Sequence, residues 1–238
     1  MKAGSPLLLK PGSTPRKNLR FNEAVPAPTI DELTVADEPA TWAALGFAVE
    51  GDTCVVGEVR VRLAGTGAGK GICGWALRDV DATELDGLPT DRSEREAPPA
   101  APPHPNGVAA IDHVVAITPD LERTVAAVEA AGIELRRIRE EPTPAGAPRQ
   151  AFFRLGEPIL EVVQEPGDVA ERAGRDRPAF FWGLALSVPD LETTVAGLGD
   201  RVSEARDAVQ PGRRIATLHR AAGLSVPVAL ISPPPPRA

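Results

Sequence analysis

Two stretches of sequence decide the fold: IDHVVAITPDLE at residues 111–122 and FWGLALSVPDLE at residues 181–192. They align without a gap, 70 residues apart (from 111 to 181), and self-similarity at a fixed offset indicates a repeated structural unit. Each begins with a short apolar run that suits a buried strand and then turns into Pro-Asp-Leu-Glu. Proline is favoured at the first position of a helix and acids at its positive end, so each stretch predicts a strand followed by a helix.

The residues after these stretches complete the repeat. Apolar residues fall on one helical face at matching positions in both copies: Leu121, Val125 and Val128 in the first, Leu191, Val195 and Leu198 in the second. Three strands are predicted after each helix, at residues 133–139, 149–155 and 158–164 in the first copy and 202–208, 213–219 and 224–231 in the second. The sequence therefore predicts two βαβββ modules, at 108–165 and 179–232.

A more divergent pair of copies precedes them, at residues 28–90. Ile30-Asp31-Glu32-Leu33 resembles Ile111-Asp112-His113-Val114, and residues 72–77 resemble 181–186, with a helix expected after them near Asp81. Proline disfavours helices and central strands, so the proline-rich residues 91–107 are predicted to be a linker and 233–238 a tail.

Composition narrows the classes of function. The chain has 238 residues, 42% of them hydrophobic, and a net charge of −7, which disfavours a general nucleic-acid binder; no apolar run is long enough to cross a membrane. Residues 1–20 carry five basic residues and no acid, so residues 1–27 are predicted to be a disordered basic tail. Two cysteines make no disulfide framework, which favours the cytoplasm, and the excess of Arg over Lys (22 to 4) favours a GC-rich bacterial genome.

The duplicated βαβββ unit, with Ile-Asp-His opening its first strand and Ile-Leu-Glu-Val-Val in its last, resembles the vicinal oxygen chelate superfamily. This superfamily includes glyoxalase I, extradiol dioxygenases, methylmalonyl-CoA epimerase, and the bleomycin and fosfomycin resistance proteins. The resemblance covers residues 108–232 well and 28–88 weakly. It implies an α+β fold whose paired modules form a curved, mostly antiparallel, cup-shaped sheet with flanking helices around a small ligand.

The resemblance also implies one divalent metal ion, Zn, Ni, Mn or Fe, held by the first and last strands of each module. His113 and Glu161 fall on two of the four ligand positions, and Glu161 is also the candidate catalytic carboxylate. The matching positions of the second module hold Gly183 and Ala229, which cannot bind a metal through a side chain. His219, on the strand before residue 224, is the candidate for a third ligand.

Other residues are candidates for the cup itself. Phe153 and Trp182 are predicted to line it, although aromatic residues on strands more commonly serve the core. Arg213 and Arg214 are candidates for binding an anion, with an ordinary surface position as the alternative. A carboxylate among the apolar neighbours of Glu161 needs a partner, which is a metal, water or an arginine of the same domain.

These observations lead to one main hypothesis and two alternatives. The main hypothesis is a glyoxalase-like protein that binds a small organic ligand in its cup and has an incomplete metal site. The first alternative is a metal-dependent lyase, isomerase or dioxygenase acting on a substrate with vicinal oxygens. The second is a non-catalytic structural or interaction module. A homodimer is compatible with each of the three.

Overall fold

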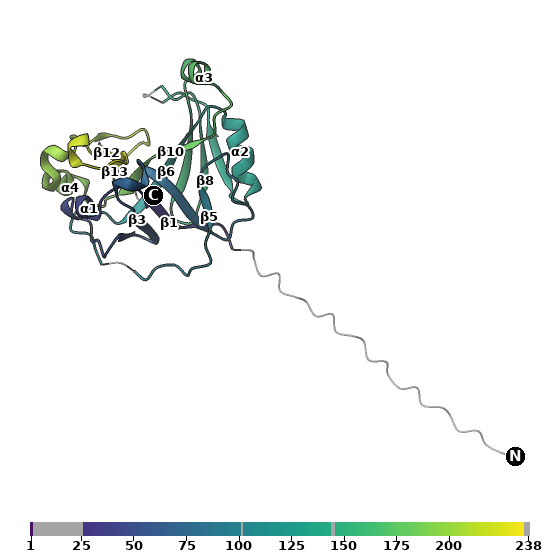
Figure 1. Cartoon of the computed structure of the whole chain (residues 1–238), viewed down its shortest axis with the longest axis horizontal. Helices are drawn as coiled ribbons and strands as arrows, with labels where there is room; N and C mark the ends of the chain where they lie inside the picture. Colours follow the sequence, from purple (N-terminus) through teal and green to yellow (C-terminus); the bar gives the residue numbers. More distant parts are fainter. Residues whose placement is uncertain (2–25, 101, 144–145, 236–238) are drawn as a thin grey trace.

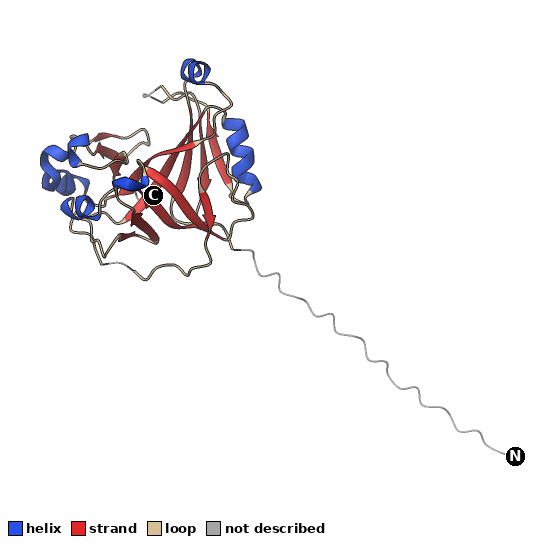
Figure 2. Cartoon of the chain, in the orientation of Figure 1, coloured by secondary structure: helices blue, strands red, loops and turns tan. Residues whose placement is uncertain are grey.

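The computed structural model describes residues 1, 26–100, 102–143 and 146–235. The chain forms two packed β-sheets with a few short helices around them (Figures 1 and 2). The predicted basic tail falls largely on residues 2–25, outside the described residues. No helix of the described residues is long and apolar enough to cross a membrane.

The C-terminal sheet contains both predicted modules. Its strand order is β11-β12-β13-β10-β6-β9-β8-β7, so each module pairs its first strand with its last in parallel, and the two first strands meet antiparallel at the centre. The strands are β6 (Ala110–Thr118), β7 (Leu135–Arg139), β8 (Gln150–Arg154), β9 (Ile159–Gln164), β10 (Phe180–Ser187), β11 (Arg206–Asp207), β12 (Arg214–Thr217) and β13 (Val228–Ile231). The predicted α+β fold with a mostly antiparallel, cup-shaped sheet is confirmed.

Both predicted helices form, each beginning two residues after the proline that was expected to open it. Helix α2 (Leu121–Ala130) and helix α4 (Leu191–Leu198) each begin after an aspartate whose side chain accepts a backbone hydrogen bond three residues on. Asp120 and Asp190 are therefore the N-caps, and the prolines precede the caps instead of opening the helices. A further helix, α3 (Gly167–Ala173), connects the modules.

The N-terminal half is a reduced version of the same plan. Its sheet has the order β2-β3-β1-β4-β5, with β1 and β4 antiparallel at the centre, as β6 and β10 are in the other sheet. Its elements are β1 (Thr29–Val35), α1 (Pro39–Ala44), β2 (Thr53–Val56), β3 (Val59–Leu63), a 3-10 turn (Thr66–Ala68), β4 (Ile72–Arg78) and β5 (Thr90–Arg92). Two further 3-10 turns, Gly199–Arg201 and Arg220–Ala222, lie in the C-terminal half.

The helix expected near Asp81 does not form, and residues 79–89 run as a loop into β5. Asp79 and Asp86 adopt left-handed backbone conformations, with φ of 55° and 52°, which end regular structure at both sides of this segment. The Asp86 carboxylate accepts hydrogen bonds from Arg123 and Thr124 of helix α2. This loop therefore contacts helix α2 in the other half of the chain.

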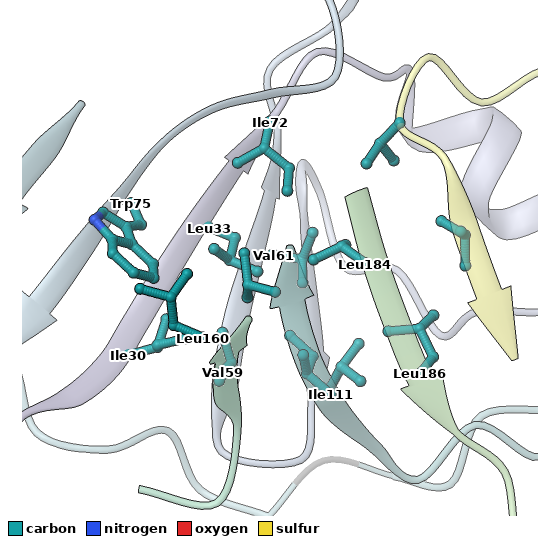
Figure 3. Close-up of a cluster of buried hydrophobic side chains, with 14 of the residues drawn as sticks. Ile30, Leu33, Val59, Val61, Ile72, Trp75, Ile111, Leu160, Leu184 and Leu186 are labelled. Carbon is teal, nitrogen blue, oxygen red and sulfur yellow. The ribbon is translucent and has the colours of Figure 1, made fainter. Parts of the chain in front are cut away.

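The hydrophobic core lies between the two sheets (Figure 3). Strand alternation sends one face of each sheet inward, and the buried side chains come from both halves: Ile30, Leu33, Val59, Val61, Ile72 and Trp75 from the first, Ile111, Leu160, Leu184 and Leu186 from the second. Burying one such aliphatic side chain stabilises a fold by about 1.5–3 kcal/mol. The opposite face of each sheet is therefore the one available for polar chemistry.

Polar contacts also join the halves. The buried Asp37 carboxylate accepts hydrogen bonds from the Ser225 backbone N–H at 2.5 Å and from the Trp42 indole at 3.1 Å. In the segment before β6, the buried His104 ring accepts the backbone N–H of Ala48 at 3.0 Å and packs edge-on against Phe47. Burial lowers the pKa of His104, which keeps the imidazole neutral in this acceptor role.

Candidate functional site

The candidate site lies on the face of the C-terminal sheet that points away from the core, which we call the C-terminal cup. A β-bulge in β6 shapes it: His113 pairs with Ala185 and Ile111 with Leu186, so the sheet register skips Asp112. Bulges re-aim side chains, and here Asp112 and His113 are both directed to the cup while the flanking Ile111 and Val114 are buried in the core.

Asp112 orients the imidazole of His113. Its carboxylate lies 2.8 Å from His113 Nδ1. Burial would raise the pKa of Asp112, but the hydrogen bonds from His113 and Arg213 hold it below its ordinary value. An ionised carboxylate only accepts hydrogen bonds, so Nδ1 donates to it and Nε2 is left facing the cup.

Arg213 anchors this arrangement. Its side chain is only 5% exposed and pairs with the Asp112 carboxylate. The same guanidinium donates to the Ser232 carbonyl at 2.6 Å and to the Gln210 side chain at 2.8 Å. Arg213, a predicted anion-binding residue, therefore has its donors engaged within the protein.

His113 and Glu161 meet at the floor of the cup. Glu161 lies on β9 beside β6, and its Oε2 is 3.4 Å from His113 Nε2, with both side chains 19% exposed. Burial raises the pKa of Glu161, and the nearby His113 charge opposes that rise. Arg137 and Arg139 also oppose it from β7. The structure thus brings together the two residues that the sequence predicted as metal ligands.

The second module closes the two remaining ligand positions. In the first module, His113 pairs with Ala185 across the centre of the sheet, and Gly183 of the second module pairs with Val115 in the equivalent way. Glu161 pairs with Val115, and Ala229 pairs with Ala185 in the equivalent way. Gly183 and Ala229 are therefore the counterparts of His113 and Glu161. A Cβ built at Gly183 would lie 2.7 Å from the Pro227 carbonyl oxygen, which already accepts the Leu184 backbone N–H. The backbone itself therefore excludes a ligating side chain at this position.

His219 is not part of the pair. Its ring contacts the Asp200 carbonyl at 3.0 Å, next to the 3-10 turn that follows α4. Across the described residues, no group of three or more His, Cys, Asp or Glu side chains is arranged to hold a metal ion. A catalytic zinc usually has three protein ligands, so the donors present do not fit the metal that the fold family implies.

The strands beside β9 contribute a polar wall to the cup. In this wall, Phe152 lies opposite Glu161 in the register, and the Arg137 guanidinium lies 4.7 Å from the centre of its ring. Trp182 of β10 is 49% exposed, and the sheet register skips it between Phe181 and Gly183. Phe153, by contrast, is fully buried in the core.

Two further arginines, Arg214 and Arg137, differ in whether their donors are engaged. Arg214 of β12 reaches Glu192 of helix α4 at 3.3 Å, so it points to the helical side of the sheet. Arg137 forms no hydrogen bond among the described residues, which leaves its donors available to the cup. Sequence reasoning missed Asp112, Phe152 and Arg137.

Comparison with known proteins identifies the fold. No family model and no curated protein matches the sequence. Among solved structures, methylmalonyl-CoA epimerase from Mycobacterium tuberculosis is 20% identical with a TM-score of 0.44, over 54% of this chain and 91% of that one. A Streptomyces coelicolor epimerase in complex with 2-nitronate-propionyl-CoA is 21% identical with a TM-score of 0.44, over 55% of this chain and 99% of that one.

One structure matches almost the whole chain. It is a fusion of a xylose isomerase-like TIM barrel with a 4-hydroxyphenylpyruvate dioxygenase. The match covers 90% of this chain and 51% of the fusion protein, with 14% identity and a TM-score of 0.58. At this identity the match shows a shared arrangement of strands and helices across both halves of the chain.

Proposed function

We propose that this chain, which has the fold of the vicinal oxygen chelate superfamily, binds a small organic anion with an apolar body in its C-terminal cup. The observation that carries the proposal is the pairing of His113 with Glu161 at the cup floor, near the Arg137 guanidinium. We assign the apolar wall of the cup to the exposed Trp182. Small-molecule sites combine an apolar wall with a few convergent polar groups, and this face has both.

Each wall has a separate role in binding. The Arg137 guanidinium lies over the Phe152 ring, 4.7 Å from its centre, and this cation–π contact holds the donor fork in place before a ligand arrives. A carboxylate or phosphate suits that fork because a guanidinium binds such groups with two parallel hydrogen bonds. The indole of Trp182 offers a large apolar surface for the rest of the ligand.

The binding experiment compares paired probes by calorimetry: benzoate and phenylacetate against the neutral benzamide and phenylacetamide. We expect the carboxylates to bind at least about tenfold more tightly than the amides, since one charge-assisted contact is worth about 1.4 kcal/mol or more. Trp182→Ala should weaken all four probes. Arg137→Gln should remove the preference for the anions.

Arg136→Gln is the matched control. Arg136 neighbours Arg137, is 50% exposed and pairs with Glu134 at 3.1 Å on the strand edge. Equal binding of carboxylates and amides, or equal effects of the two arginine substitutions, would contradict the proposal.

The metal-dependent alternative requires ligands beyond His113 and Glu161, and the closure at Gly183 counts against it. A homodimer and a cytoplasmic location stay predictions from the sequence. Size-exclusion chromatography of the full chain tests the first of these, and an elution volume of a single 25.0 kDa chain would reject it.

A further inference from the structure

The N-terminal sheet presents a second face of the same design, which we call the N-terminal cup. Thr34 of β1 pairs with Arg62 on one side and Gly74 on the other, as Val115 of β6 pairs with Glu161 and Gly183. The likeness extends to a second proline: a Cβ at Gly74 would lie 3.1 Å from the Pro89 carbonyl, which accepts the Trp75 N–H.

The bulge is repeated as well. The register of β1 skips Asp31, between Ile30 and Glu32, just as that of β6 skips Asp112. Asp31 therefore matches Asp112, Glu32 matches His113, and Arg62 matches Glu161. In place of the His113–Glu161 couple, the N-terminal cup has an ion pair in which Arg62 Nε lies 3.1 Å from Glu32 Oε1.

The two cups differ in what lies over them. Residues 93–96, which we call the strap, cross the N-terminal cup after β5. Arg95 donates from Nε to Asp31 Oδ2 at 2.7 Å and from a terminal nitrogen to Glu32 Oε2 at 2.8 Å. One guanidinium thus bridges the two carboxylates at the positions that correspond to Asp112 and His113.

The two carboxylate oxygens of Asp31 have different partners, one on the sheet and the other on the strap. Its Oδ1 atom is held by Arg60 and Arg78, both on strands of the sheet. Its Oδ2 atom is held by Ser93, at 2.7 Å, and Arg95, both on the strap. Burial would raise the pKa of Asp31, but the hydrogen bonds from Ser93 and Arg95 hold it below its ordinary value.

We infer that the N-terminal cup is a guanidinium-binding site whose permanent ligand is Arg95 of the same chain. Two carboxylates converge on one planar donor group, and fixed arginines neutralise the remaining oxygens. The Arg95 side chain is 51% exposed, so its outer side faces solvent and the position is within reach of a free guanidinium once the side chain is removed. This cup is closed by the chain itself, and the C-terminal cup is the one open to an outside ligand.

Chemical rescue tests this inference on the full chain. Arg95→Ala should lower the melting temperature by about 2–6 °C, because it removes charge-assisted hydrogen bonds from a fully buried carboxylate. Methylguanidinium chloride at about 50 mM should then raise the melting temperature of Arg95→Ala by about 1–3 °C relative to a control arginine variant. Methylammonium chloride at equal ionic strength should not, since an ammonium lacks the planar fork.

Arg92→Ala is that control, because Arg92 immediately precedes the strap and, among the described residues, its side chain donates only to the Asp81 carbonyl, at 3.1 Å. An equal response of the two variants to methylguanidinium, or an Arg95→Ala melting temperature equal to that of the parent, would overturn the inference. If Arg95→Ala fails to fold alone, recovery of folded protein on refolding with methylguanidinium supports the site, and failure in both solutions overturns it.

Discussion

Arg213→Ala should lower the free energy of unfolding by about 3–5 kcal/mol, the range for breaking a buried ion pair by removing one partner. The Arg213 side chain is 5% exposed and Asp112 is 15% exposed, so the abandoned carboxylate has little access to water. The Ser232 carbonyl and Gln210 side chain lose their donor at the same time. Urea unfolding followed by circular dichroism measures the change.

The adjacent arginine is the matched control. Arg214 is 47% exposed, and its contact with the 66% exposed Glu192 is screened by solvent. Arg214→Ala should therefore change the unfolding free energy by less than about 1 kcal/mol. If both substitutions cost the same, Arg213 does not anchor the Asp112–His113 arrangement as described.

Gly183→Ala should cost about 2–3 kcal/mol, because the added Cβ lies 2.7 Å from the carbonyl oxygen of Pro227 on the backbone of a neighbouring segment. Relief requires movement of β10 or of the segment before β13, at the centre of the sheet. Chemical denaturation of the variant checks the value.

Gly197→Ala is the control for that substitution. Gly197 lies inside helix α4, and a Cβ added there would meet nothing within 4 Å, so alanine should be neutral or stabilising by up to about 1 kcal/mol. A Gly183→Ala chain as stable as the parent would show that the second ligand position is open, and it would revive a fuller metal centre.

Most of the fold that could be predicted from the sequence came from the repeat. The gapless match of residues 111–122 to 181–192 sets the register of β6 and β10, because apolar runs of equal length must bury the same alternate side chains. In the structure, Gly183 and Ala229 occupy the positions of the second module that correspond to His113 and Glu161, as the alignment of the two copies predicted. The divergent N-terminal copies match this pattern less closely, and the prediction of a helix near Asp81 was wrong.

The site was predictable only where strand geometry is regular. His113 and Glu161 were assigned from the resemblance to the superfamily, on strands that the repeat located. The bulge at Asp112 breaks alternation, and its partner Arg213 is distant in sequence. Phe153 was predicted to line the cup, but a signal in the sequence could have pointed to Phe152 instead. A two-residue turn at residues 156–157 places Phe152 opposite Glu161, hence on the same face of the sheet.

Elemental analysis shows whether the C-terminal cup has an incomplete metal centre. The full chain is purified without chelator or metal-affinity tag and measured for Zn, Ni, Mn and Fe beside Glu161→Gln. We expect far less than one metal ion per chain in both proteins, because two side chains provide too few ligands for a stable site. Near-stoichiometric metal in the parent, lost in Glu161→Gln, would contradict this expectation and establish the metal-dependent alternative.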